Sequence, residues 1–243
     1  MEFKSGPIKI AVGKPSPPRD AEADRATLHA VNDALEAGQI EAAERMAEAA
    51  LAQGLQHPML YNLAAERLEA QDRFGEALRL LQQGHGLAPD DVGLRQALAL
   101  CLFRLQRYAE ALPHFDALVA AEPGFAPGHA ARAATLDALG RFEAADAGYR
   151  RSLELEPGNL LAVAGLASLA SRRGRHAEAR ALAERVLQAE PGYPEALIVL
   201  AKADLAQGQA AQGQARLHGL IADPRATPEQ RAFAERLLAD GSA

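Results

Sequence analysis

The sequence predicts an all-α fold, a solenoid of stacked antiparallel helix pairs, and three observations carry this prediction. Prolines recur every 34 residues, at Pro89, Pro123, Pro157 and Pro191. A second position recurs with the same spacing and is glycine in most copies, at Gly38, Asp72, Gln106, Gly140, Gly174 and Gly208. Hydrophobic residues make up 49% of the chain but aromatic ones only 5%, so the apolar material is mostly Ala and Leu, which are strong helix formers.

Each repeated unit is expected to hold two helices and two turns. Each interval between the recurring positions is long enough for a helix of roughly 20 Å, at ~1.5 Å per residue. A glycine just past a helix closes it, and a proline after the next helix prevents that one from continuing. Small residues are expected where the two helices of a unit meet, at Ala65, Ala99, Ala133, Ala167 and Ala201 in the first helices and at Ala77, Ala111, Ala145 and Ala179 in the second. Since one pair cannot bury its own apolar faces, successive pairs must stack.

The repeated pattern resembles the tetratricopeptide repeat (TPR), in the form found in bacterial proteins. The unit of residues 126–159 shows it, with Ala133, Gly140, Phe142, Ala145 and Pro157 at the eighth, fifteenth, seventeenth, twentieth and thirty-second places. The resemblance covers roughly 200 residues and implies a right-handed α-solenoid, the TPR superhelix, with six repeats at 24–57, 58–91, 92–125, 126–159, 160–193 and 194–227. The pattern departs at its edges, where Leu55 and Arg225 replace the proline of the first and sixth repeats.

The two ends of the chain differ from the repeats. Residues 1–22 contain four prolines and scattered lysines, and this predicts an extended or disordered tail. A further alternative is that the tail docks on an acidic groove of this chain or of a second copy, which would produce self-association. Residues 228–243 follow Thr227 and are predicted to form a C-terminal capping helix with Phe233, Leu237 and Leu238 on one face.

The sequence points to no catalytic, metal or cofactor chemistry. Cys101 is the single cysteine, expected to be a small buried thiol, and the seven histidines show no metal-ligand spacing. The net charge is -6 without a basic cluster, which argues against nucleic acid. No secretory signal and no membrane-spanning run are apparent, so we predict a non-enzymatic cytoplasmic protein without membrane insertion.

The resemblance implies a concave groove, lined by the first helix of each repeat, that binds a protein or peptide ligand. Carried onto this sequence, the partner-binding candidates are Arg25, Asn32, Glu36, Asn62, Glu66, Glu69, Gln96, Leu100, Phe103, Arg104, Asp137, Ser168, Arg172 and Lys202. Their acidic members lie in the N-terminal half, whereas the C-terminal half sets Arg104, Arg172 and Lys202 against Asp137 alone, and this predicts a dipolar groove. The amides of Asn32 and Asn62 are expected to pair with a ligand's main chain.

We therefore predict a protein–protein interaction adaptor that binds a peptide or a partner helix. The alternative is the partner-recruiting N-terminal TPR arm of a larger enzyme, of sulfotransferase or glycosyltransferase type, or of a secretion complex. A reading frame that continues past Ala243 would favour this alternative. Chaperone-tail binding is not implied, because the clamp of the TPR subclass that performs it is incomplete here: its positions hold Leu28, Asn32, Leu63, Gly93 and Ala97, and only Asn32 matches.

Overall fold

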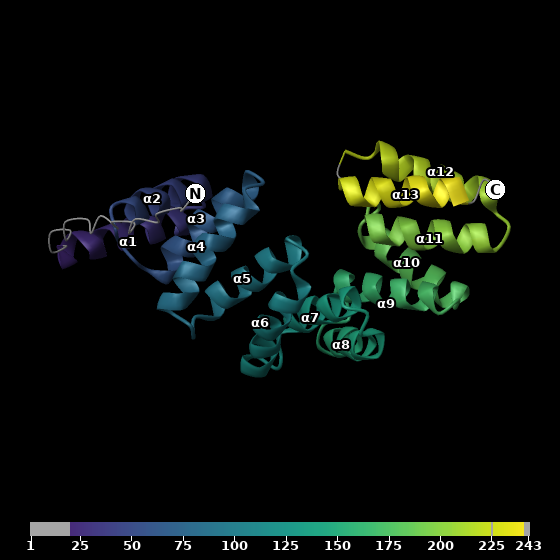
Figure 1. The fold of residues 1–243 in the computed structure, drawn as a ribbon, viewed down its shortest axis with the longest axis horizontal. Helices are drawn as coiled ribbons and strands as arrows, with labels where there is room; N and C mark the ends of the chain where they lie inside the picture. Colours follow the sequence, from purple (N-terminus) through teal and green to yellow (C-terminus); the bar gives the residue numbers. More distant parts are fainter. Residues whose placement is uncertain (1–19, 225, 241–243) are drawn as a thin grey trace, which may run out of the picture. The chain divides into compact units, whose positions relative to one another are not determined.

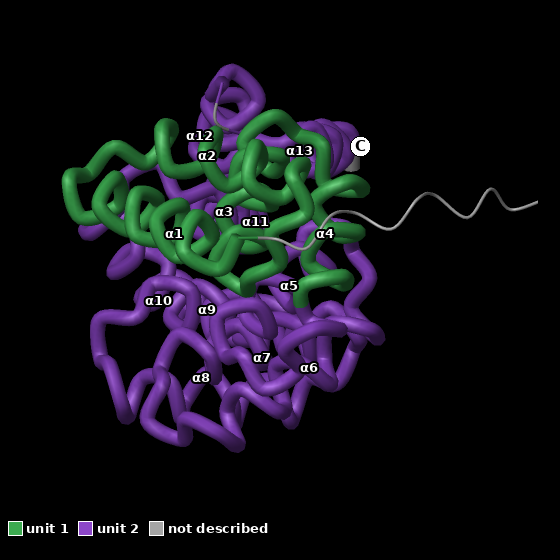
Figure 2. Tube along the Cα trace, turned by 90° about the vertical axis from the view of Figure 1, so that its left-hand side faces the viewer, with its two compact units in different colours: residues 1–84 green, residues 85–243 purple. Residues whose placement is uncertain are grey.

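The computed structural model describes residues 20–224 and 226–240, and every regular element in these ranges is an α-helix (Figure 1). The chain divides into two compact units, residues 1–84 and 85–243, which are coloured separately in Figure 2 and described separately below. Unit 1 contains α1 (Ala21–Glu36), α2 (Ile40–Ala52), α3 (Pro58–Ala70) and most of α4 (Phe74–Leu87). Unit 2 contains α5 (Val92–Arg104), α6 (Tyr108–Ala121), α7 (Ala126–Ala138), α8 (Phe142–Leu155), α9 (Leu160–Arg172), α10 (His176–Ala189), α11 (Pro194–Ala206), α12 (Ala210–Ala222) and α13 (Pro228–Asp240).

The helices recur with the same 34-residue spacing as the sequence pattern. The odd-numbered helices from α3 onward begin at residues 58, 92, 126, 160, 194 and 228, and each even-numbered helix follows after a short turn. In unit 1, α2 packs against α1 and α3, and in unit 2 each helix from α5 to α13 packs against the next one in the chain. The predicted fold class, an all-α solenoid of stacked helix pairs, is therefore confirmed. None of the helices in the described ranges is long and apolar enough to cross a membrane.

The turn inside each pair explains the recurring glycine. All six residues at this position have positive φ, with values of 70° at Gly38, 58° at Asp72 and Gln106, 74° at Gly140, 70° at Gly174 and 75° at Gly208. Glycine adopts this left-handed conformation without steric cost, whereas other residues do so rarely. The arginine that follows has its own role, because three of these arginines pair with a glutamate three residues later, at Arg73–Glu76, Arg107–Glu110 and Arg175–Glu178.

Replacing Gln106 by glycine is expected to stabilise unit 2 by about 0.5–1 kcal/mol, because the left-handed conformation costs a non-glycine residue ~1–2 kcal/mol and the greater entropy of the unfolded chain offsets part of the gain. The reciprocal variant Gly140→Gln should destabilise by a similar amount, since Gly140 has φ 74° in the same turn of the next repeat. Urea unfolding followed by circular dichroism measures both. A destabilised Gln106→Gly variant would contradict this account of the turn.

Small residues bring the helices of unit 2 together as the sequence predicts. Ala133 of α7 and Ala145 of α8 belong to one buried cluster, and both are 0% exposed. A Cβ atom added to Gly148 would lie 2.9 Å from the Cβ of Ala133, so these two helices leave no room for a larger side chain. The thiol of Cys101 is fully buried, as expected.

The C-terminal helix α13 closes the last pair of unit 2. Its start is a capping box, in which the backbone N–H of Gln230 donates to Thr227 Oγ1 at 3.2 Å and the N–H of Thr227 donates to Gln230 Oε1 at 2.8 Å. Leu237 and Leu238 pack against the core cluster beneath it. Phe233 differs from the prediction, because the buried Ala234 contributes to that cluster and Phe233 lines a surface hollow instead.

The N-terminal helix starts earlier than predicted. Helix α1 begins at Ala21, so Ala21 and Glu22 are helical, although the sequence assigned them to the tail. The cause is local, because the Asp20 carboxylate accepts a hydrogen bond from the backbone N–H of Glu22 at 3.0 Å and caps the helix. The rest of the predicted tail, residues 1–19, lies outside the described residues.

Candidate functional site

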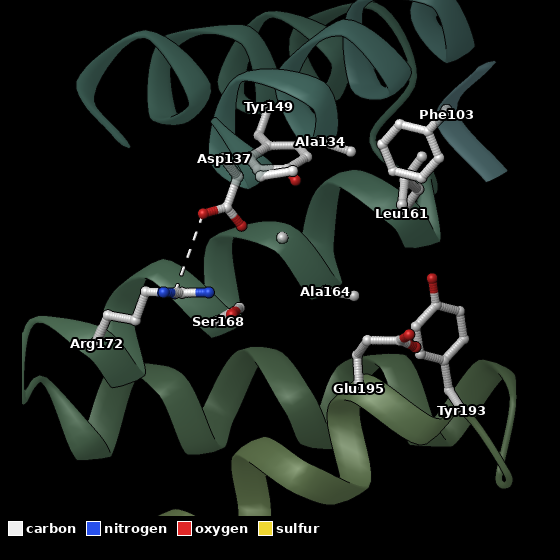
Figure 3. A pocket seen from close by; sticks show the side chains of 12 residues that line it. Phe103, Ala134, Asp137, Tyr149, Leu161, Ala164, Ser168, Arg172, Tyr193 and Glu195 are labelled. Atoms are coloured by element: carbon white, nitrogen blue, oxygen red, sulfur yellow. Dashed lines mark ion pairs between the residues drawn. The ribbon is translucent and has the colours of Figure 1, made fainter. Parts of the chain in front are cut away.

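Two adjoining hollows lie on unit 2 along α7, α9 and α11, whose successive members contact one another. The first hollow, shown in Figure 3, has a volume of about 310 Å³ and is lined by Phe103, Ala134, Asp137, Ala138, Tyr149, Leu161, Ala164, Gly165, Ser168, Arg172, Tyr193 and Glu195. The second has a volume of about 170 Å³ and is lined by Ser168, Ser171, Arg172, Glu195, Ile198, Val199, Lys202 and Phe233. Ser168, Arg172 and Glu195 line both, so we call the residues of the two hollows together the groove face.

A close contact between Tyr149 and Gly165 forms part of the wall of the first hollow. Tyr149 comes from α8, and its ring lies so near α9 that a Cβ on Gly165 would be 2.1 Å from the Tyr149 Cζ. Only glycine allows the ring to take this place. Burial also raises the pKa of the Tyr149 phenol, so this hydroxyl stays protonated throughout the physiological range.

Asp137 and Arg172 supply opposite charges at the first hollow. Arg172 Nε lies 4.0 Å from Asp137 Oδ1, and its guanidinium also lies over the Phe142 ring, 5.3 Å from the ring centroid. Burial raises the pKa of the Asp137 carboxyl, and the Arg172 charge only partly opposes that shift. The carboxylate at this site is therefore incompletely stabilised by its surroundings.

Lys202 is the corresponding cation of the second hollow. Its Nζ lies 4.8 Å from the centroid of the Phe233 ring, a cation–π contact between α11 and α13. Burial lowers the pKa of Lys202, and the nearby Arg172 charge lowers it further. Within residues 20–224 and 226–240, the contact of the Lys202 ammonium is the Phe233 ring and not a carboxylate, so its charge is available to a ligand.

The structure brings together five of the predicted site residues on the groove face, namely Phe103, Asp137, Ser168, Arg172 and Lys202. Three others from unit 2 line neither hollow, namely Gln96, Leu100 and Arg104, because α5 reaches the first hollow only through Phe103. In unit 1, Arg25 and Asn32 line a separate hollow of about 300 Å³. The remaining candidates, Glu36, Asn62, Glu66 and Glu69, also lie in unit 1.

The two asparagines of unit 1 already use their amide donors. Asn32 Nδ2 donates to Glu36 Oε1 at 2.7 Å, and Asn62 Nδ2 donates to Glu66 Oε1 at 2.9 Å. Both pairs are one helical turn apart, which places the side chains on the same face. Burial raises the pKa of Glu66, and the charges of Glu44 and Glu69 raise it further. One N–H of each amide is therefore engaged with a glutamate, and the second N–H is the one that a ligand's main chain could use.

Sequence reasoning missed several residues of the groove face. Leu161 and Glu195 stand at the second place of their repeats, one of the places that line the groove in similar proteins, so the same reasoning could have found them. Tyr149 belongs to a second helix, α8, and Tyr193 lies in the turn before α11, so neither stands in the first helices that were expected to line the groove. Glu195 also corrects the predicted charge balance, because Asp137 is not the single acidic residue opposite Arg172 and Lys202.

No group of three or more His, Cys, Asp or Glu side chains in the described part of the chain could hold a metal ion. The hollows instead combine aromatic walls, small residues and isolated charges. Such surfaces bind ligand side chains by shape and charge.

The regular helix pairs and the hollowed face along their first helices define a helical-repeat protein. Two family models described as "Tetratricopeptide repeat" match the chain, one at residues 68–135 and 170–237 and the other at residues 28–92 and 131–194. Since each model matches more than half of the chain, the chain belongs to the tetratricopeptide repeat family. No curated protein matches it.

Solved structures show the same fold. PilW, a widely conserved type IV pilus biogenesis factor, is 19% identical with a TM-score of 0.66, over 88% of this chain and 99% of PilW. TTC0263, a thermophilic TPR protein of Thermus thermophilus, is 20% identical with a TM-score of 0.62, over 75% of this chain and 100% of its own. MamA from Desulfovibrio magneticus RS-1 is 18% identical with a TM-score of 0.60, over 70% of this chain and 97% of that one. The repeats support a role in protein interaction.

Proposed function

We propose that this chain is a non-catalytic adaptor that binds an extended peptide or a helix of a partner protein on the groove face of unit 2. The observation that carries the proposal is the sharing of Ser168, Arg172 and Glu195 between two adjoining hollows. Because the hollows adjoin at these residues, one ligand segment can place consecutive side chains in both.

The composition of the groove face supports a peptide ligand. Ala134, Ala164 and Gly165 leave space that a partner's larger side chains can fill, and Phe103 and Tyr193 offer aromatic surface. The groove face also carries charges of both signs, from Arg172 and Lys202 and from Asp137 and Glu195, which can fix the direction in which a ligand lies.

The predicted dipolar groove stays a prediction. Its acidic members lie in unit 1 and its basic members in unit 2, and within unit 2 the groove face already carries both signs of charge. The cytoplasmic location and self-association through residues 1–22 also stay predictions.

A variant that fills both hollows tests the proposal. Ser168 is partly exposed and lines both, so Ser168→Trp is expected to reduce capture of a bound partner about 10-fold or more, because its side chain occupies the ligand's space. The measurement is a pull-down from the host lysate with quantitative mass spectrometry, followed by titration of the retained partner.

The matched control is Ala181→Trp, which adds the same side chain at an exposed position of α10 that lines neither hollow. Thermal unfolding should show that both variants fold. If the partner is retained equally by both variants, it binds elsewhere on the chain and the proposal is wrong.

A further inference from the structure

One carboxylate oxygen in the first hollow lacks a hydrogen-bond donor. Asp137 extends from α7 into the hollow, between Tyr149 and Arg172 (Figure 3). Its Oδ1 is buried, and no described residue donates a hydrogen bond to it. Its ion-pair partner, Arg172 Nε, is 4.0 Å away, beyond hydrogen-bond distance. A buried carboxylate oxygen without a donor is unfavourable, so a ligand that supplies an N–H group here gains affinity.

Asp204, a fully buried carboxylate of unit 2, shows what satisfies such an oxygen. Asp204 is 0% exposed and accepts hydrogen bonds from two arginines, with Arg180 Nη2 at 2.7 Å and Arg216 Nε at 2.9 Å. Asp137 has a single arginine at a longer distance. The comparison indicates that the environment of Asp137 lacks one guanidinium.

The walls of the first hollow suit the same group. The rings of Phe103, Tyr149 and Tyr193 line it, and aromatic faces attract a flat guanidinium through cation–π contacts. Glu195 supplies a second carboxylate beside Tyr193. The two carboxylates outnumber the cation Arg172, so the hollow favours a positively charged occupant over a negatively charged one.

We propose that the first hollow binds an arginine side chain of the partner peptide, with its guanidinium donating to Asp137 and its stem lying against the aromatic rings. The inference rests on the proposed function of the groove face. A volume of about 310 Å³ accommodates one long side chain rather than a folded element. A lysine has a single point of charge and would form fewer of these contacts.

The test needs no identified partner. The probes are acetyl-Ala-Arg-Ala-amide and the same peptide with citrulline, which keeps the shape of arginine without its charge. Titrations of the isotope-labelled protein, followed by nuclear magnetic resonance, should give about 10-fold tighter binding of the arginine peptide, because its hydrogen bonds to Asp137 are charge-assisted. The shifted amides should belong to residues lining the first hollow.

Asp137→Asn should lower the affinity for the arginine peptide to about that of the citrulline peptide, whereas Asp116→Asn, at an exposed ion pair with Arg132, should leave it unchanged. Equal binding of the two peptides by the intact protein would overturn the inference. So would preferential binding of a glutamate peptide that is lost in Lys202→Gln. If either of these two outcomes occurs while Ser168→Trp still reduces partner capture, the arginine inference fails and the proposed function stands.

Discussion

Asp204→Asn is expected to lower the free energy of unfolding of unit 2 by about 3 kcal/mol, because removing one partner of a buried ion pair leaves the others uncompensated. Asp204 of α11 is 0% exposed and joins Arg180 of α10 to Arg216 of α12. The two arginines are partly exposed and recover some hydration, which keeps the loss at the low end of the range for buried pairs. Urea unfolding measures the change.

The control for this prediction is Asp116→Asn, the same substitution at an ion pair between α6 and α7. Asp116 Oδ1 lies 2.5 Å from Arg132 Nε, but its side chain is 47% exposed. An exposed pair contributes only ~0–1 kcal/mol, so this variant should unfold almost as the intact protein does. If both substitutions lowered the free energy of unfolding equally, burial of Asp204 would not be the reason for the large effect expected of Asp204→Asn. Amide hydrogen exchange should further show faster opening of α10, α11 and α12 in Asp204→Asn alone.

Gly165→Ala is expected to destabilise unit 2 by about 2 kcal/mol, since overpacking a close contact costs ~1–3 kcal/mol. The new methyl group would lie 2.1 Å from the Tyr149 Cζ, and the Tyr149 side chain is itself buried. Either the ring or the α9 backbone must move, and both line the first hollow. We therefore also expect weaker binding of the arginine peptide. The two measurements are urea unfolding and the peptide titration.

A glycine-to-alanine substitution should instead increase stability where the added methyl group has open space around it. Gly219 in α12 has no atom within 4 Å of an added Cβ, so Gly219→Ala should stabilise by up to ~1 kcal/mol through helix propensity. Combining Gly165→Ala with Tyr149→Leu should cost less than the sum of the two single changes, because the smaller side chain removes the clash. Strict additivity would show that the ring does not cause the loss.

The repeat pattern predicted the architecture through particular residues. Gly140 and its equivalents marked left-handed turns, and the same spacing correctly included Asp72 and Gln106, which keep positive φ without being glycine. Ala133 and Ala145 marked the close approach of two helices. These predictions succeed because turn conformation and helix contact depend on residues a fixed distance apart in the chain.

The candidate site was predicted only in part. Position in the repeat selected Phe103, Asp137, Ser168, Arg172 and Lys202, which line the two hollows, and their binding of a partner stays a prediction. Position in the repeat did not distinguish these residues from Gln96 and Arg104, which lie outside both hollows. Nor did it show that Asn32 and Asn62 donate to neighbouring glutamates, since the rotamers that form these bonds depend on surrounding side chains.

The sequence by itself determined the repeat period, the helix pairs and the family, because 34-residue spacing and helix termination are properties of local chain segments. Only the tertiary structure decided which side chains form the two hollows, that Tyr149 lies against Gly165, and that Asp204 is buried between two arginines while Asp137 has one. These features depend on distances between side chains of different helices and on how much water each charge loses, and neither quantity is encoded in the spacing of residues along the chain.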